Sequence, residues 1–189
     1  MQHKQIQSKV CIAVLSVWLA VVSAFPASAN MTATIQLDQQ ILVKRSEAPA
    51  YFKRIIHLYD AAIFSSQDAS LVDVLDADSS SCLVLYYQRS IPKSAFAKAA
   101  EKVLRRQLGD VEFATISDSL DRLNKAFDDV NEGDNYRFCR LAGGSVRLYR
   151  GERLVLNLQD AAFGRHYLGI WLDKNGLSKR LRTELSRFN

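Results

Sequence analysis

The run of residues 52–64 is largely apolar on both of its alternating faces, and this feature constrains the fold more than any other in the chain. Successive side chains of a strand point to opposite sides of the sheet. One side of this run carries Ile56, Leu58, Ala62 and Phe64, and the other carries Ile55, His57, Tyr59, Ala61 and Ile63. A strand of this composition is stable when both of its faces are covered. The sequence therefore predicts a central strand with a layer on each side.

The other periodic segments indicate an α+β fold. Alternating apolar patterns predict strands over residues 34–43, 82–91, 136–141, 145–150 and 153–158, with a turn at residues 46–49. Apolar stripes with caps predict helices over residues 93–108, 117–130, 160–172 and 178–187. Strands and helices come in groups and do not alternate strictly. This order favours a mainly antiparallel β-sheet with helices layered on it.

The N-terminal segment, residues 1–29, has the three parts of a cleavable signal peptide. Lys4 and Lys9 are followed by an apolar run and by the small-residue pattern that ends at Ala29. The apolar run is shorter than the roughly 20 residues that a membrane-spanning helix needs. We therefore expect a periplasmic or secreted protein whose mature domain is residues 30–189, with no stable membrane span after cleavage.

Composition and motifs exclude several classes of function. The net charge of +5 is only mildly basic, and no aromatic residues interleave with the basic residues near the C-terminus. We expect no nucleic-acid partner, because single-stranded sites combine both residue types. A nucleophile elbow, a phosphate-binding glycine loop and metal-binding His or Cys motifs are all absent. We therefore expect no cofactor and no metal. Two interpretations of Cys82 and Cys139 stay open, a disulfide or two buried thiols.

Cationic and tyrosine side chains on the predicted strands are the candidate binding residues. They are Lys44, Arg45, Arg54, Tyr59, Tyr86, Tyr87 and Arg89. A guanidinium beside tyrosine hydroxyls in an apolar pocket suits a carboxylate, phenolate or enolate oxygen. The alternative is that the tyrosines belong to the core and the arginines lie at its rim.

Three stretches together resemble the chalcone isomerase-like family, in particular its exported bacterial branch. They are FKRIIHLYDAAIF (residues 52–64), LVLYYQRSIPKSAFAKAAEKVL (residues 83–104) and VRLYRGERLVLNLQDAAFGRHYLGIWLDKNGLSKRLRTEL (residues 146–185). The resemblance implies an open-faced sandwich, in which a large antiparallel sheet carries helices on one face and a ligand cleft lies between the two layers.

The resemblance also implies two activities. Active plant members cyclise chalcones with an arginine on an early strand, and plastid relatives hold a fatty-acid carboxylate with an arginine and a tyrosine. Arg45 and Arg54 are candidates for the arginine, and Tyr59 and Tyr86 for the tyrosine. The glycine step that usually precedes the family arginine is missing from residues 39–52.

We therefore expect a non-catalytic protein that binds a small amphipathic ligand such as a fatty acid. Two alternatives stay open. One is a chalcone isomerase-type intramolecular lyase that acts on a phenolic or enone substrate. The other is a structural or partner-binding periplasmic domain whose protein partner the sequence does not name.

Overall fold

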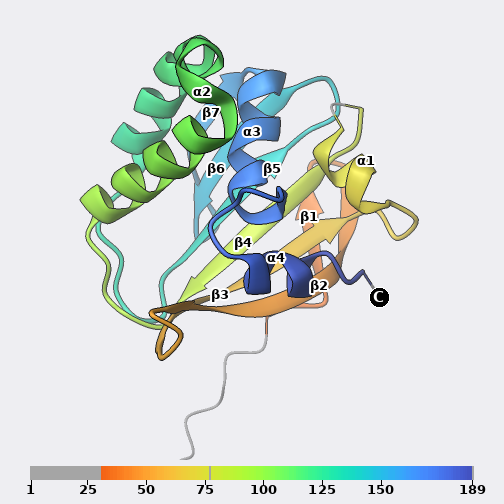
Figure 1. The fold of residues 1–189 in the computed structure, drawn as a ribbon. Helices are drawn as coiled ribbons and strands as arrows, with labels where there is room; N and C mark the ends of the chain where they lie inside the picture. Colours follow the sequence, from red (N-terminus) through yellow and green to blue (C-terminus); the bar gives the residue numbers. More distant parts are fainter. Residues whose placement is uncertain (1–30, 77, 189) are drawn as a thin grey trace, which may run out of the picture. The chain divides into compact units, whose positions relative to one another are not determined.

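The computed structural model describes residues 31–76 and 78–188, and the expected signal peptide lies outside these residues. A single antiparallel sheet of seven strands runs through the described part of the chain, and each strand pairs with its neighbours in sequence (Figure 1). The strands are β1 (Thr34–Leu37), β2 (Gln40–Phe52), β3 (Ile56–Ser65), β4 (Ser81–Tyr87), β5 (Asn135–Arg140), β6 (Ser145–Arg150) and β7 (Arg153–Gln159). The predicted α+β class with an antiparallel sheet is confirmed.

Helices cover one face of this sheet, which we call the front face (Figure 1). The helices of the described residues are α1 (Leu71–Leu75), α2 (Lys93–Ala126), α3 (Ala161–Leu172) and α4 (Lys179–Leu185). Helix α2 is interrupted at Gly109, whose φ of 71° favours glycine. The predicted break at Gly109 is correct, but the second helical segment follows at once. Ser117 does not cap it, because its hydroxyl donates to the carbonyl of Ala114 inside the helix.

Strand β3 is central and contributes to apolar clusters on both sides of the sheet, as the sequence predicts. Tyr59, Ala61 and Ile63 belong to the large cluster under the helices. Ala62 and Phe64 belong to a smaller cluster on the opposite side, which we call the back face. The alternation of the strand therefore fills two cores from one segment.

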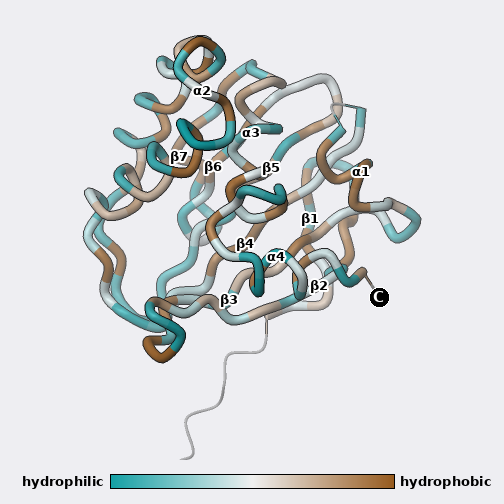
Figure 2. Tube along the Cα trace, in the orientation of Figure 1, coloured by the Kyte–Doolittle hydropathy of each residue, from teal (hydrophilic) through white to brown (hydrophobic). Residues whose placement is uncertain are grey.

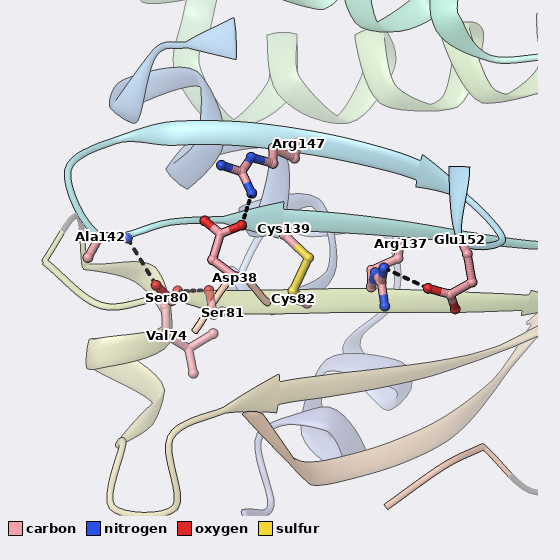
Figure 3. Close-up of a disulfide and its surroundings, with 10 residues drawn as sticks. All are labelled: Asp38, Val74, Ser80, Ser81, Cys82, Arg137, Cys139, Ala142, Arg147 and Glu152. Atoms are coloured by element: carbon pink, nitrogen blue, oxygen red, sulfur yellow. Dashed lines mark hydrogen bonds and ion pairs between the residues drawn. A yellow bond between two sulfur atoms is a disulfide. The ribbon is translucent and has the colours of Figure 1, made fainter. Parts of the chain in front are cut away.

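The back face is closed by a disulfide and by the β1–β2 hairpin. Cys82 on β4 and Cys139 on β5 lie directly opposite each other in the strand register and form a disulfide. Asp38, in the turn between β1 and β2, accepts a hydrogen bond from Arg147 on β6 at 2.6 Å, beside that disulfide (Figure 3). These strands are far apart in the sheet order, so the sheet must curl for this contact to form. Of the two interpretations of these cysteines, the structure has the disulfide and not two buried thiols.

A glycine lets α3 approach the sheet closely. A Cβ atom at Gly164 would lie 2.7 Å from Val146 Cγ2 and 2.8 Å from Arg140 Cγ. Arg140 itself is buried, and its guanidinium donates to the carbonyls of Val74 and Asp76 at the end of α1. This packing fixes the position of α3, which carries three side chains of the cleft described below.

The sequence prediction was wrong at three places in the N-terminal region. The central strand begins at Ile56 and not at Phe52, because residues 53–55 form a turn. Residues 34–43 form a hairpin and not one strand, because the chain turns at Asp38, where φ is 51°. Residues 46–49 form no turn and lie inside β2. Pro49 fits there because β1 pairs only with residues 40–43, so the missing N–H of Pro49 can face the unpaired edge.

Candidate functional site

A cleft with two adjoining chambers lies between the front face of the sheet and the helices. The inner chamber has a volume of ≈ 480 Å³ and is lined from β3, β4, α2 and α3. The outer chamber has a volume of ≈ 650 Å³ and lies between the β2–β3 hairpin and the start of α4. Both chambers are lined by Phe52, Leu58, Tyr59 and Leu177. These four side chains therefore mark the junction.

The inner chamber is mainly apolar. On the sheet side, strand alternation points Leu85 and Tyr87 toward the helices. On the helix side, Phe96, Ala99, Ala100 and Val103 recur at spacings of three and four residues, which places them on one face of α2. The volume lies within the range of about 300–1,000 Å³ that is typical of small-molecule sites.

Three buried tyrosines give this chamber its polar groups. The hydroxyl of Tyr59 accepts a hydrogen bond from Trp171 Nε1 at 3.0 Å, which leaves its own proton available to donate. The hydroxyls of Tyr87 and Tyr167 make no hydrogen bond to another described residue. Burial raises the pKa of Tyr59 to about 12 and raises the pKa of Tyr87 and of Tyr167 as well. All three are therefore neutral near pH 7 and act as O–H donors.

The charged side chains that line the two chambers are all cationic. Arg54, Lys179 and Arg180 line the outer chamber, and Lys102 and Arg106 line the inner one. Among the residues that the structure describes, neither lining includes an aspartate or a glutamate. A cleft that carries one sign of charge attracts ligands of the opposite sign. The cleft therefore suits an anion with an apolar body.

Arg106 also ties the helices together over the cleft. Its Nη2 donates to the carbonyl of Asn175 at 2.7 Å and to the carbonyl of Gly176 at 2.7 Å, in the segment between α3 and α4. These bonds hold the chain next to Leu177 against α2. The junction between the chambers is therefore positioned by a side chain far away in sequence.

The structure brings together two of the four residues that the family resemblance singled out. Tyr59 lines both chambers and Arg54 lines the outer one. Arg45 lines neither chamber, and its Nη1 donates to the carbonyls of Ser66 at 2.7 Å and Ala69 at 2.9 Å. Tyr86 lines neither chamber either, because strand alternation places it on the back face, on the same side of β4 as Val84.

Sequence reasoning missed the helical half of the site. Tyr167 and Trp171 lie four residues apart on α3, and their only signal was an apolar helix stripe that also fits ordinary core packing. Within residues 31–76 and 78–188, no three His, Cys, Asp or Glu side chains lie together as a metal site would require. In the same segments, no helix combines the length and the apolar character needed to cross a membrane.

The sequence and the fold were both compared with those of known proteins. A family model described as chalcone isomerase-like matches residues 27–185. Among solved structures, the chain is similar to the crystal structure of a fatty-acid binding protein of Arabidopsis thaliana. The TM-score is 0.61 at 12% sequence identity, over 82% of this chain and 90% of that chain. At this identity the likeness shows the fold alone. A search of curated proteins gave no match.

Proposed function

The chain belongs to the chalcone isomerase-like family, and from that premise we propose that it binds a single-chain amphipathic lipid, such as a fatty acid, without catalysing a reaction. One observation carries the proposal: an apolar inner chamber meets an outer chamber whose lining is cationic, and Tyr59 lies at their junction. The structural likeness to a plant fatty-acid binding protein supports the same ligand class.

The two chambers suit the two ends of such a ligand. The acyl chain would occupy the inner chamber, where each buried methylene contributes about 0.8 kcal/mol. The carboxylate would lie at the junction, where Tyr59 can donate its hydroxyl proton and Arg54 supplies a positive charge. A hydrogen bond to a charged group is worth about 1.5–3 kcal/mol, and exposure of Arg54 to solvent reduces its share.

The isomerase alternative receives less support from the cleft. Active relatives are expected to hold the substrate oxyanion with an arginine on an early strand. The guanidinium of Arg45 is engaged with two backbone carbonyls, and Arg54 lies in the exposed turn between β2 and β3 instead of on a strand. The structural alternative expects a cleft filled by the protein's own side chains, whereas the inner chamber has a volume of ≈ 480 Å³. We also propose that the mature protein, residues 30–189, acts in the periplasm after export. N-terminal sequencing of the protein from a periplasmic fraction tests this.

A tryptophan at the junction tests the binding proposal. Leu58 lines both chambers, so Leu58→Trp should place a larger side chain where the ligand passes. We expect the affinity for laurate, measured by isothermal titration calorimetry, to fall at least about tenfold, or about 1.4 kcal/mol. Leu154→Trp is the matched control, because Leu154 is exposed on β7 and lines neither chamber.

The control should bind laurate as the wild type does. In the same titrations, Arg54→Ala should weaken binding by about tenfold if Arg54 holds the carboxylate. The proposal fails if the wild type does not bind laurate or similar acids. It also fails if Leu58→Trp binds as tightly as the wild type. Turnover of a chalcone faster than in buffer would favour the isomerase alternative.

A further inference from the structure

Four large apolar side chains are exposed around the mouth of the outer chamber. The exposed fraction is 40% for Tyr51, 53% for Phe52, 81% for Ile55 and 41% for Leu177. The other exposed large apolar side chains of the described residues lie singly elsewhere, at Ile41, Val72, Val111 and Leu154. Single exposed apolar residues are ordinary on a protein surface, whereas a contiguous group marks an interaction site.

The four side chains and their cationic neighbours come from two segments that meet at the outer chamber, residues 51–55 and 177–180. Phe52 and Leu177 line the same two chambers, and the backbone N–H of Ile55 donates to the carbonyl of Phe52 at 3.3 Å. The guanidinium of Arg180 lies 5.8 Å from the ring centroid of Tyr51. We define the mouth patch as Tyr51, Phe52, Lys53, Arg54, Ile55, Leu177, Lys179 and Arg180.

The tip of the β2–β3 hairpin presents two cations in an unusual backbone conformation. Lys53 has a φ of 50° and Arg54 has a φ of 67°. The loop has three residues, and Lys53 and Arg54 are the central pair of the turn that the Ile55 N–H closes onto the Phe52 carbonyl. Positive φ at both central positions is usual for Asn-Gly, because other side chains rarely adopt this conformation. Figure 2 shows the loop between β2 and β3 as a hydrophobic stretch next to a hydrophilic one, at the lower left end of the sheet below β3. Lys53 and Arg54 lie between Phe52 and Ile55 in the sequence, so the loop carries two long basic side chains flanked by two exposed apolar ones.

The mouth patch carries positive charge and no negative charge. It contains four Lys or Arg residues, and neither residues 50–56 nor residues 177–181 include an aspartate or a glutamate. A second copy of the chain is a poor occupant, because a two-fold interface would bring the same cations together. Apolar side chains flanked by cations match the interface of an anionic bilayer, where the former insert and the latter meet the headgroups.

We infer that the mouth patch docks the protein onto an anionic phospholipid bilayer. In this orientation the outer chamber opens toward the lipid surface. A single-chain lipid could then move between bilayer and cleft without crossing bulk water. That last step rests on the proposed function, whereas the membrane contact does not and can be measured without a ligand.

Co-sedimentation with vesicles tests the inference. The vesicles contain either phosphatidylcholine alone or phosphatidylcholine mixed with an equal amount of phosphatidylglycerol. The wild type should bind the mixed vesicles more strongly, and added salt should weaken this binding. The variant Lys53→Glu with Ile55→Ser changes two side chains that line neither chamber. It should bind mixed vesicles at least about tenfold more weakly, because it loses an inserting side chain and reverses one charge.

The matched control is Lys125→Glu with Val111→Ser, which makes the same charge reversal and a comparable apolar-to-serine exchange at two exposed positions of α2. It should bind mixed vesicles as the wild type does, and both double variants should keep the wild-type affinity for laurate. The inference is overturned if the wild type binds both kinds of vesicle equally well. It is overturned likewise if the mouth-patch variant binds mixed vesicles as strongly as the control does. It is also overturned if the patch variant abolishes a dimer instead, seen by size-exclusion chromatography. Laurate binding without vesicle binding would leave the proposed function standing.

Discussion

The two faces of the sheet are built in opposite ways. The back face is small and closed, with a disulfide between β4 and β5 and an ion pair from Arg147 to Asp38 across the curled sheet. The front face has the larger apolar cluster, yet it keeps a cleft between the sheet and the helices. The hollow face can remain open because the closed face and the helices α3 and α4 hold the sheet in shape. The ligand cleft therefore lies on one side of the sheet and the disulfide on the other.

Removal of the disulfide should have the largest effect on stability. The bond joins residues separated by 57 positions, and a crosslink over such a loop stabilises a protein by about 4 kcal/mol in the chain-entropy description. Urea denaturation of Cys82→Ala with Cys139→Ala should show a loss of this order. The affinity for laurate, measured where the variant is still folded, should change little because the bond lies on the back face. A large loss of affinity in the folded variant would show that the faces are not independent.

The second largest expected effect is a loss of stability at alkaline pH, which comes from a buried tyrosine on the front face. Burial raises the pKa of Tyr59 from 10.0 to about 12, so the folded state holds this proton more tightly than the unfolded state does. The contribution to stability is fully present below pH 10 and is lost as the pH rises toward 12. For Tyr59 alone the loss is on the order of 3 kcal/mol. Urea midpoints measured at increasing pH should fall in this window, and the fall should be smaller in Tyr59→Phe.

The smallest expected effect comes from two neighbouring tyrosines of β4, which lie on opposite faces of the sheet. Tyr87 lines the inner chamber with an unpaired hydroxyl, whereas Tyr86 lies on the back face. An acyl chain would remove water from the hydroxyl of Tyr87 without replacing its hydrogen bond. We expect Tyr87→Phe to bind laurate about fivefold more tightly, or about 1 kcal/mol. Calorimetry should show no change for Tyr86→Phe, and equal behaviour of the two variants would contradict the assignment of faces.

Alternation and helical periodicity were enough to predict most of the fold. The strands near residues 82–91, 145–150 and 153–158, and the helix at residues 160–172, correspond to β4, β6, β7 and α3 within a few residues at their ends. The N-terminal region was harder. The turn at Lys53 and Arg54 contains neither glycine nor asparagine, so no turn signal marks it and the strand was predicted to start at Phe52.

The site was predictable only where strand position alone decides it. Tyr59 was found because it lies on a central strand, but periodicity could not say which of two adjacent tyrosines faces the helices. That choice depends on register, and a shift by one residue exchanges the faces. Arg45 was a reasonable candidate by charge. Its partners Ser66 and Ala69 are brought to it only by the tertiary fold.

The order of the strands has a consequence for how the sheet assembles. Every pairing joins strands that follow one another in the chain, and the longest intervening segment, residues 88–134, separates β4 from β5. Loop closure costs more entropy as the loop lengthens, so this pairing is the least favourable to begin. The disulfide joins this same pair of strands. In an oxidised unfolded chain, the disulfide therefore already holds together β4 and β5, the pair of strands with the longest loop between them. The pairings that remain join strands closer in sequence, and such contacts form fastest.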